Sequence, residues 1–261
     1  MHVNAVNLRG MTMAKAGNKL DIIFEDEYMI ACVKPYGVSV QPDNGDGEDL
    51  MTAVKNYLYD GASEEEPYLA VINRLDKPVS GIVLYAKTEE MAASLADLLQ
   101  SDEMSKYYQA VVTGFMDEPE GTLTDWMIFD KKTNTSKIVT PDTKGAKKAE
   151  LNYEVLDELD TDEGPISYLL IELLTERHHQ IRCQLAHAGL GIWGDIKYNT
   201  KFKDKSSKSS KAKGRTKAGK GSGIGLFSTM LEFTHPVTGE EISLHREPEG
   251  EAFDIIDQMD W

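Results

Sequence analysis

Two apolar runs flank a charged, tight connection in the stretch AVINRLDKPVSGIVLYAKT, which spans residues 70–88. The runs at 69–72 and 82–86 predict strands, because β-branched and aromatic residues fit a pleated, half-buried surface. Between them lie Arg74 and Asp76, followed by a proline and a glycine that favour a turn. Opposite charges on a short link between two sheet strands are either a surface ion pair, which contributes under about 1 kcal/mol, or part of a functional site.

Strands dominate the rest of the chain, and helices are interspersed without the regular alternation of a doubly wound fold. This pattern predicts an α+β fold: a single domain with a mixed, largely antiparallel sheet flanked by helices and loops. Further strands are expected at 21–24, 28–34, 107–114, 151–156, 166–173, 226–233 and 241–245. Helices are expected at 49–58, after a Thr88 cap, and at 177–189, where a glycine ends the pattern.

The net charge of −16 conceals one basic segment on an acidic body. Residues 201–220 hold eight Lys and one Arg against one Asp, a net of +8, so the remainder sums to −16 − 8 = −24. We expect a disordered insertion over 200–225, because its Ser, Lys and Gly content buries too little apolar surface to fold. It is either a solvated linker or an arm that neutralises nucleic-acid phosphates. In the second case its candidate phosphate contacts are Lys208, Lys211, Lys213 and Arg215.

Several features bear on the compartment and the chain ends. No apolar run is long enough to span a membrane, and the first 20 residues lack an apolar secretion signal. Cys32 and Cys183 lie far apart and form neither a disulfide framework nor a metal-binding spacing. We therefore expect a cytoplasmic protein with no membrane contact and a flexible tail at 1–19, and we expect a monomer.

The segment TERHHQIRCQLAH combines histidines, a cysteine and arginines in a helical pattern. His179, Cys183 and His187 could be imagined as zinc ligands, but no fourth ligand with a suitable spacing appears, so we expect no metal. Arg182 adjoins the apolar positions of this helix. A guanidinium in that place requires a carboxylate partner.

The segment KYYQAVVTG enters a strand, so Tyr107 and Tyr108 point to opposite faces of the sheet. One ring should lie in the core, and the other is either ordinary packing or available to stack. The chain has no serine or cysteine nucleophile motif and no paired carboxylates of a hydrolase type. Asp76 is therefore the best-placed nucleophile or base.

The stretches NRLDKPVSGIVLYAKT, KYYQAVVTG and TERHHQIRCQLAHAGLGIWGDIKY occur in this order and at these separations in one family. With both flanking hairpins, the chain after residue 19 resembles the RluA-type RNA pseudouridine synthases. The resemblance implies the pseudouridine synthase fold over 20–261 and an isomerase that converts uridine to pseudouridine in ribosomal or transfer RNA. It also implies base flipping, RNA as the partner, and no metal or organic cofactor.

The resemblance also implies roles for individual residues. Asp76 stands at the catalytic aspartate, and Arg182 at the arginine that pairs with it and favours its anion. Tyr108 stands at the tyrosine whose ring packs on the flipped base, and Arg74 at the arginine that enters the space the uridine leaves. We expect further RNA contacts at Lys106, Arg177 and His179.

The chain departs from the family pattern at four positions. Asn73 stands where the family has His, Val79 where it has Thr, and Glu176 and His178 where it has Gly and Thr. These departures leave an alternative open, a catalytically inert RNA-binding or ribosome-assembly factor on the same scaffold. Many relatives carry an S4 RNA-binding domain, which we do not expect here. The arm and the active site should then make nearly all phosphate contacts.

Overall fold

A single sheet of eleven strands organises the fold. The computed structural model describes residues 20–43, 49–59, 61, 66–202 and 223–257. The strands are β1 (Asp21–Glu25), β2 (Met29–Lys34), β3 (Ala70–Val71), β4 (Ser80–Ala86), β5 (Ser105–Thr113), β6 (Glu120–Asp130), β7 (Thr135–Val139), β8 (Lys147–Thr161), β9 (Gly164–Leu173), β10 (Leu226–Thr234) and β11 (Glu241–His245). The helices are α1 (Leu50–Leu58), α2 (Glu89–Gln100), α3 (Gln180–His187) and α5 (Glu251–Asp257).

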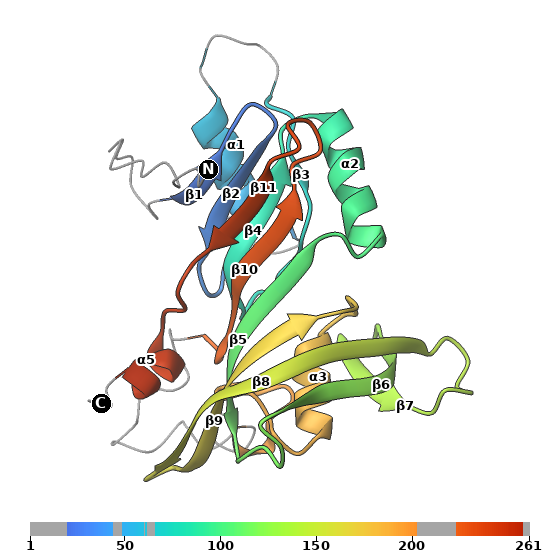
Figure 1. Ribbon diagram of the computed structural model, residues 1–261, viewed down its shortest axis with the longest axis vertical. Helices are drawn as coiled ribbons and strands as arrows, with labels where there is room; N and C mark the ends of the chain where they lie inside the picture. Colours follow the sequence, from blue (N-terminus) through green and yellow to red (C-terminus); the bar gives the residue numbers. More distant parts are fainter. Residues whose placement is uncertain (1–19, 44–48, 60, 62–65, 203–222, 258–261) are drawn as a thin grey trace.

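The strand order is β1-β2-β4-β10-β5-β9-β8-β6-β7, with β3 beside β4 and β11 beside β10. β4 and β10 run parallel, and the other pairs of these strands are antiparallel. The expected mixed, largely antiparallel sheet is therefore confirmed. β5 runs from the part of the sheet formed by β1, β2, β4, β10 and β11 to the part formed by β9, β8, β6 and β7 (Figure 1).

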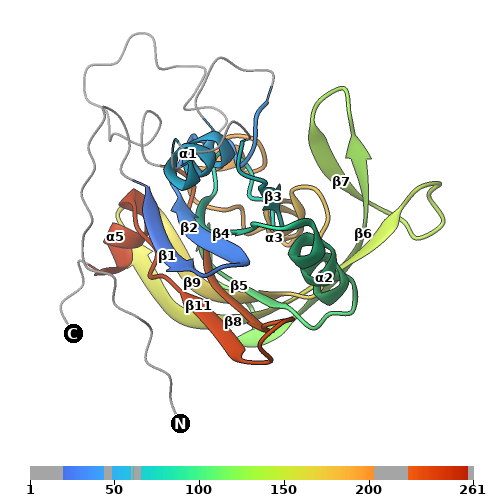
Figure 2. The same cartoon turned by 90° about the horizontal axis from the view of Figure 1, so that it is seen from above.

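The central strands are covered on both faces, as their continuous apolar runs require. On β4, Val83 and Tyr85 belong to the cluster that includes residues of α1 and α3. Ile82 and Leu84, which alternate with them, belong to the cluster that includes α2. The alternation of a strand thus places the helices on opposite faces of the sheet, and Figure 2 shows the sheet curving beneath α1 and α3.

Two helices begin at capping side chains, of which the sequence predicts Thr88. The Asp49 side chain accepts a hydrogen bond from the backbone N–H of Thr52 at 2.9 Å and begins α1. Thr88 accepts one from Met91 N–H at 3.1 Å and begins α2. Each side chain satisfies one of the N–H groups that a helix leaves without an internal partner.

Gly81 allows β4 and β10 to approach each other just after the charged turn. Its φ is +123°, and a Cβ at this position would lie 2.4 Å from the backbone nitrogen and oxygen of Ser228. Gly81 and Ser228 are register partners in the parallel pair. Only glycine combines this backbone conformation with this close contact.

The hairpin of β6 and β7 is absent from the expected elements, and β8 is much longer than the expected strand at 151–156. Most side chains of β6 are exposed or half-buried, so its apolar signal is weak. The partner strand β8 pairs with it over eight residues, from Glu120 to Met127. Tertiary pairing, rather than local pattern, makes this segment a strand.

Part of the sequence predictions lies outside the described residues. These are the tail at 1–19 and the segment 203–222 of the basic insertion, which contains Lys208, Lys211, Lys213 and Arg215. Within the expected insertion, Phe202 and Ile224 are buried at 6% and 9% exposure, so its ends pack into the fold. Among the helices of the described residues, none is long and apolar enough to cross a membrane.

Candidate active site

The charged turn between β3 and β4 presents alternate side chains to the core and to the surface. Asn73 and Leu75 are buried, at 2% and 7% exposure, whereas Arg74 is exposed and the Asp76 side chain is 26% exposed. The Asn73 amide donates to Ile82 O at 2.9 Å and accepts from Leu84 N–H at 2.8 Å. Asn73 and Leu75 therefore fix the turn to β4, and this leaves Asp76 open to solvent.

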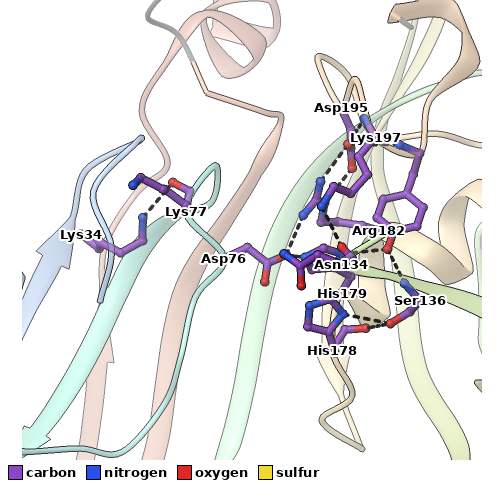
Figure 3. Close-up of polar contacts among 11 residues, drawn as sticks. Lys34, Asp76, Lys77, Asn134, Ser136, His178, His179, Arg182, Asp195 and Lys197 are labelled. Atoms are coloured by element: carbon purple, nitrogen blue, oxygen red, sulfur yellow. Dashed lines mark hydrogen bonds and ion pairs between the residues drawn. The ribbon is translucent and has the colours of Figure 1, made fainter. Parts of the chain in front are cut away.

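The expected contact between Asp76 and Arg182 is present. Arg182 Nη1 donates to Asp76 Oδ2 at 2.8 Å, although the two residues lie 106 positions apart in the chain (Figure 3). The Arg182 side chain is only 5% exposed. The buried guanidinium and the carboxylate therefore form a short, charge-assisted hydrogen bond.

The helix that carries Arg182 begins later than the sequence predicts. α3 starts at Gln180 rather than at Arg177, because His179 has a φ of +55° and His178 precedes the helix. The expected helix over 177–189 would put His178 one turn before Arg182 on the same face, and this expectation is wrong. His178 instead stacks on His179, with ring centroids 3.7 Å apart.

A second carboxylate, Asp195, holds Arg182 from the opposite side. Arg182 Nε donates to Asp195 Oδ2 at 2.7 Å, and Nη2 donates to Oδ1 at 2.9 Å. Asp195 is 1% exposed and also accepts from the backbone N–H of Lys197 at 2.9 Å. Burial lowers the pKa of Arg182, but Asp195 and Asp76 outweigh this effect and raise it above its ordinary value.

His179 lies beside the carboxylate as a neutral imidazole. Its Nε2 is 3.5 Å from Asp76 Oδ2, and its Nδ1 is 2.7 Å from the hydroxyl of Tyr198. Burial lowers the pKa of His179 to about 3, despite the attraction of Asp76. The guanidinium carbon of Arg182 also lies 5.1 Å from the centre of the Tyr198 ring, so Tyr198 contacts both side chains.

Lys34, at the end of β2, supports the other side of the turn. It is fully buried, and its Nζ donates to Pro35 O at 3.0 Å, Val38 O at 2.9 Å and Lys77 O at 3.3 Å. Burial lowers its pKa to about 7, while Asp76 acts in the opposite direction. Lys34 thereby ties β2 to the residue that follows Asp76.

Tyr108 is the buried ring of its pair, as the strand alternation predicts. It is 6% exposed and belongs to the same apolar cluster as Leu75 and Ile181. Burial raises its pKa, and the charges of Glu176 and Asp76 add to this effect. The ring therefore lies next to both the charged turn and α3.

The other expected RNA contacts within the described residues already contact protein groups or lie at the surface. Lys106 is 7% exposed, and its Nζ lies 3.2 Å from Glu176 Oε2, so Glu176 pairs with Lys106. Arg177 Nε donates to Lys148 O at 2.9 Å. Arg74 is exposed in the charged turn, two residues before Asp76.

Sequence reasoning missed Asp195, Tyr198 and Lys34. Asp195 and Tyr198 lie in the quoted GDIKY run, but the sequence of a loop after a helix does not show which side chains its residues will contact. Lys34 gives a clearer signal, because a lysine at the end of an apolar strand must find acceptors when it is buried. In the described part of the chain, no three His, Cys, Asp or Glu side chains gather into a metal site.

Comparisons with known proteins agree with this geometry. A family model described as RNA pseudouridylate synthase matches residues 28–187, more than half of the chain. The chain is 27% identical to tRNA pseudouridine synthase C of Vibrio vulnificus over 257 residues, which covers 93% of this chain and 96% of that protein. It is 28% identical to ribosomal large subunit pseudouridine synthase D of Salmonella typhimurium over 240 residues, covering 92% and 70%.

Solved structures show the same fold. Human RNA pseudouridylate synthase domain containing 1 superposes with a TM-score of 0.67 at 18% identity, covering 90% of this chain and 86% of that one. Human RNA pseudouridylate synthase domain containing 4 superposes with a TM-score of 0.65 at 21% identity, covering 88% of each chain. Because the family model matches more than half of the chain, the chain belongs to the RNA pseudouridylate synthase family, whose members convert uridine to pseudouridine in RNA.

Proposed function

We propose that Asp76 drives the isomerisation of uridine to pseudouridine in ribosomal or transfer RNA. The observation that carries this proposal is the 2.8 Å contact between Arg182 and an Asp76 carboxylate that remains 26% exposed. The buried guanidinium donates a charge-assisted hydrogen bond to this carboxylate, and the exposure leaves the carboxylate accessible to a nucleotide. Both residues lie within the segment that matches the family.

The reaction replaces the N–C glycosidic bond of one nucleotide with a C–C bond. The N1–C1′ bond breaks, the uracil rotates, and C5 bonds to C1′; the C5 proton leaves to solvent and N1 takes up a proton. The Asp76 anion either attacks C1′ or removes the C2′ proton, and both routes require it to be ionised. Because no electrons are gained or lost, the proposed route requires no redox cofactor.

Neighbouring side chains complete the proposed site. Arg182, held by Asp195, orients Asp76 and offsets its charge. Tyr108 packs against the flipped uracil, and since it is only 6% exposed, the base must enter deeply. Arg74 fills the gap in the RNA and thereby offsets the few kcal/mol that flipping costs.

The proposed RNA contacts differ in how much they must rearrange. Arg74 is exposed and can act directly, whereas Lys106 must leave Glu176 and Arg177 must leave Lys148 O. His179 is neutral and contributes a hydrogen bond rather than a charge. The residues outside the described part of the chain, Lys208, Lys211, Lys213 and Arg215, add an electrostatic contribution if the arm binds RNA.

The names of the relatives suggest two RNA classes, since one acts on transfer RNA and the other on the large ribosomal subunit. We place the reaction in the cytoplasm, where both RNAs occur, and propose that one chain suffices because Asp76, Arg182 and Tyr108 all come from the same chain. The buried free thiols of Cys32 and Cys183 agree with a reducing compartment.

Mapping pseudouridines in total RNA tests the proposal. A strain that lacks the gene should lose one or more pseudouridines, the wild-type gene should restore them, and Asp76→Asn should not. If the strains with and without the gene have the same pseudouridines, while the affinity of the purified protein for RNA still depends steeply on salt concentration, the inert RNA-binding alternative is correct. If Asp76→Asn restores the same positions, the role of Asp76 is refuted.

A further inference from the structure

An aromatic stack leads from the β6–β7 hairpin to the Asp76 carboxylate. The Phe129 and His178 ring centroids are 4.1 Å apart, and those of His178 and His179 are 3.7 Å apart. The last ring in this series, His179, lies 3.5 Å from Asp76. At the outer end of the stack, Phe129 is 45% exposed.

The hairpin is fixed to the site by polar contacts, so the position of Phe129 is set before any ligand binds. The backbone N–H of Ser136 donates to the Tyr198 hydroxyl at 2.7 Å, and the Ser136 hydroxyl contacts His178. Lys197 Nζ donates to Asn134 O at 2.8 Å. Figure 3 shows Asn134 and Ser136 beside the two histidines, and Figure 2 shows the hairpin projecting from the sheet.

The surroundings of the stack favour a nucleic-acid strand. Lys197 reaches the β6–β7 turn at Asn134 O, and Arg74 is exposed two residues before Asp76. Burial lowers the pKa of His178; Asp76 opposes this effect, and nearby cations add to it. Lys131 and Lys132 are exposed in the turn that follows Asp130, the residue after Phe129, and Asp130 itself is paired with Lys137 at 3.5 Å. The two lysines therefore add positive charge at the outer end. A neutral ring stack bordered by cations is the arrangement that single-stranded RNA binds, with bases on rings and phosphates on cations.

We propose that Phe129 and His178 form a stacking platform for an RNA base that flanks the target uridine. The platform rests on the proposed function, because the uridine must enter beside Asp76 for its neighbour to reach Phe129. His178 takes the place where the resemblance has a threonine, so the platform is a feature of this chain. It would set which nucleotide next to the uridine is favoured, with a purine preferred for its larger ring surface.

Binding to short synthetic RNAs tests the platform without requiring turnover. The probes are 12-nucleotide ribose-phosphate chains of equal charge with a single uridine and otherwise abasic positions. A second set carries one adenine at either side of the uridine. For the full-length wild-type chain, fluorescence anisotropy should give at least roughly 5-fold tighter binding with adenine at one flanking position, since one stacked base contributes that much or more.

Variants assign this gain to the platform. Phe129→Ala and His178→Thr should lose most of the adenine gain and keep the affinity for the probe with uridine alone, whereas Phe129→Trp should retain the gain. Phe115→Ala is the matched control, because Phe115 is 47% exposed and directly follows Gly114, which lies against Leu190 beyond the C-terminal end of α3. It should behave as the wild type.

The outcomes separate the platform from the proposed function. An adenine gain that persists in Phe129→Ala, or is absent from a wild-type protein that binds the uridine probe, overturns the platform and leaves the proposed function intact. Failure to bind any RNA overturns both. Thermal melting within a few degrees of the wild type shows that each variant is folded.

Discussion

Asp195→Asn should impair catalysis without removing any group that touches the RNA. Asp195 Oδ1 accepts from Arg182 Nη2 and from two backbone N–H groups, those of Lys197 and Tyr198, and an asparagine oxygen can keep these three bonds. Oδ2 accepts from Arg182 Nε at 2.7 Å. The amide nitrogen of asparagine would take this place and set one donor against another.

The cost follows from these contacts. A hydrogen bond to a charged group contributes about 1.5–3 kcal/mol, and removing one partner of a buried ion pair costs about 3–5 kcal/mol when nothing else neutralises the other. Asp76 still neutralises Arg182, so we expect a loss near the lower end, about 2–3 kcal/mol. This loss corresponds to roughly 5–10 °C in the melting temperature.

The effect on activity is larger than the effect on RNA binding. Once Nε loses its anchor, the Arg182 guanidinium can rotate, and Asp76 loses its fixed position. Misplacing a catalytic group by about 1 Å can lower turnover by up to about 100-fold, whereas the RNA contacts remain. Release of tritium from RNA labelled at uridine C5 measures kcat and KM, because the C5 hydrogen leaves when pseudouridine forms.

Asp125→Asn is the matched control for this prediction. Asp125 Oδ2 accepts from the side-chain amide of Gln184 on the same helix at 2.9 Å and makes no contact with Arg182. We expect its turnover to match the wild type. Wild-type kcat and melting temperature in Asp195→Asn would refute the idea that Arg182 needs this second carboxylate.

Three further predictions test local features. Burial lowers the pKa of His179 to about 3, so below pH 6.5 this residue binds a proton in the unfolded chain but not in the folded chain. His179 should therefore lower the free energy of unfolding by about 2 kcal/mol between pH 7 and pH 5. Urea titrations at both pH values should show a smaller decrease in the free energy of unfolding for His179→Asn than for the wild type. An equal decrease would contradict the lowered pKa of His179. Gly81→Ala should destabilise the fold by about 3 kcal/mol, because its Cβ meets the Ser228 backbone at 2.4 Å and its φ is positive; an unchanged melting temperature would show that the strands need no such approach. Deleting residues 203–220, whose net charge is +7, should flatten the dependence of RNA affinity on salt concentration while keeping the buried Phe202, and an unchanged slope would make the segment a linker.

Local patterns were sufficient to predict the elements that carry strong apolar periodicity or a cap. The closing hairpin of β10 and β11 and the start of α1 at Asp49 lie where the sequence places them. The contact between Asp76 and Arg182 could be expected only from the resemblance, because no spacing links residues 106 positions apart.

Features that depend on tertiary contacts could not be predicted in this way. The helical pattern continues from Arg177, yet His179 adopts a left-handed conformation and contacts Tyr198 instead of extending α3. Asp195 acquires its role only when the loop that follows α3 folds back on Arg182. The β6–β7 hairpin is fixed by β8 and by Tyr198, which lies 62 residues beyond Ser136.

Tritium release by Asp76→Asn is the most direct test of the central claim. The RNA comes from a strain that lacks the gene and is labelled with uridine tritiated at C5. Because Arg182 remains paired with Asp195, the variant should melt and bind RNA as the wild type does, yet release no tritium above the protein-free background. Release at the wild-type rate would contradict the account, because a neutral amide can neither attack the sugar nor accept its proton.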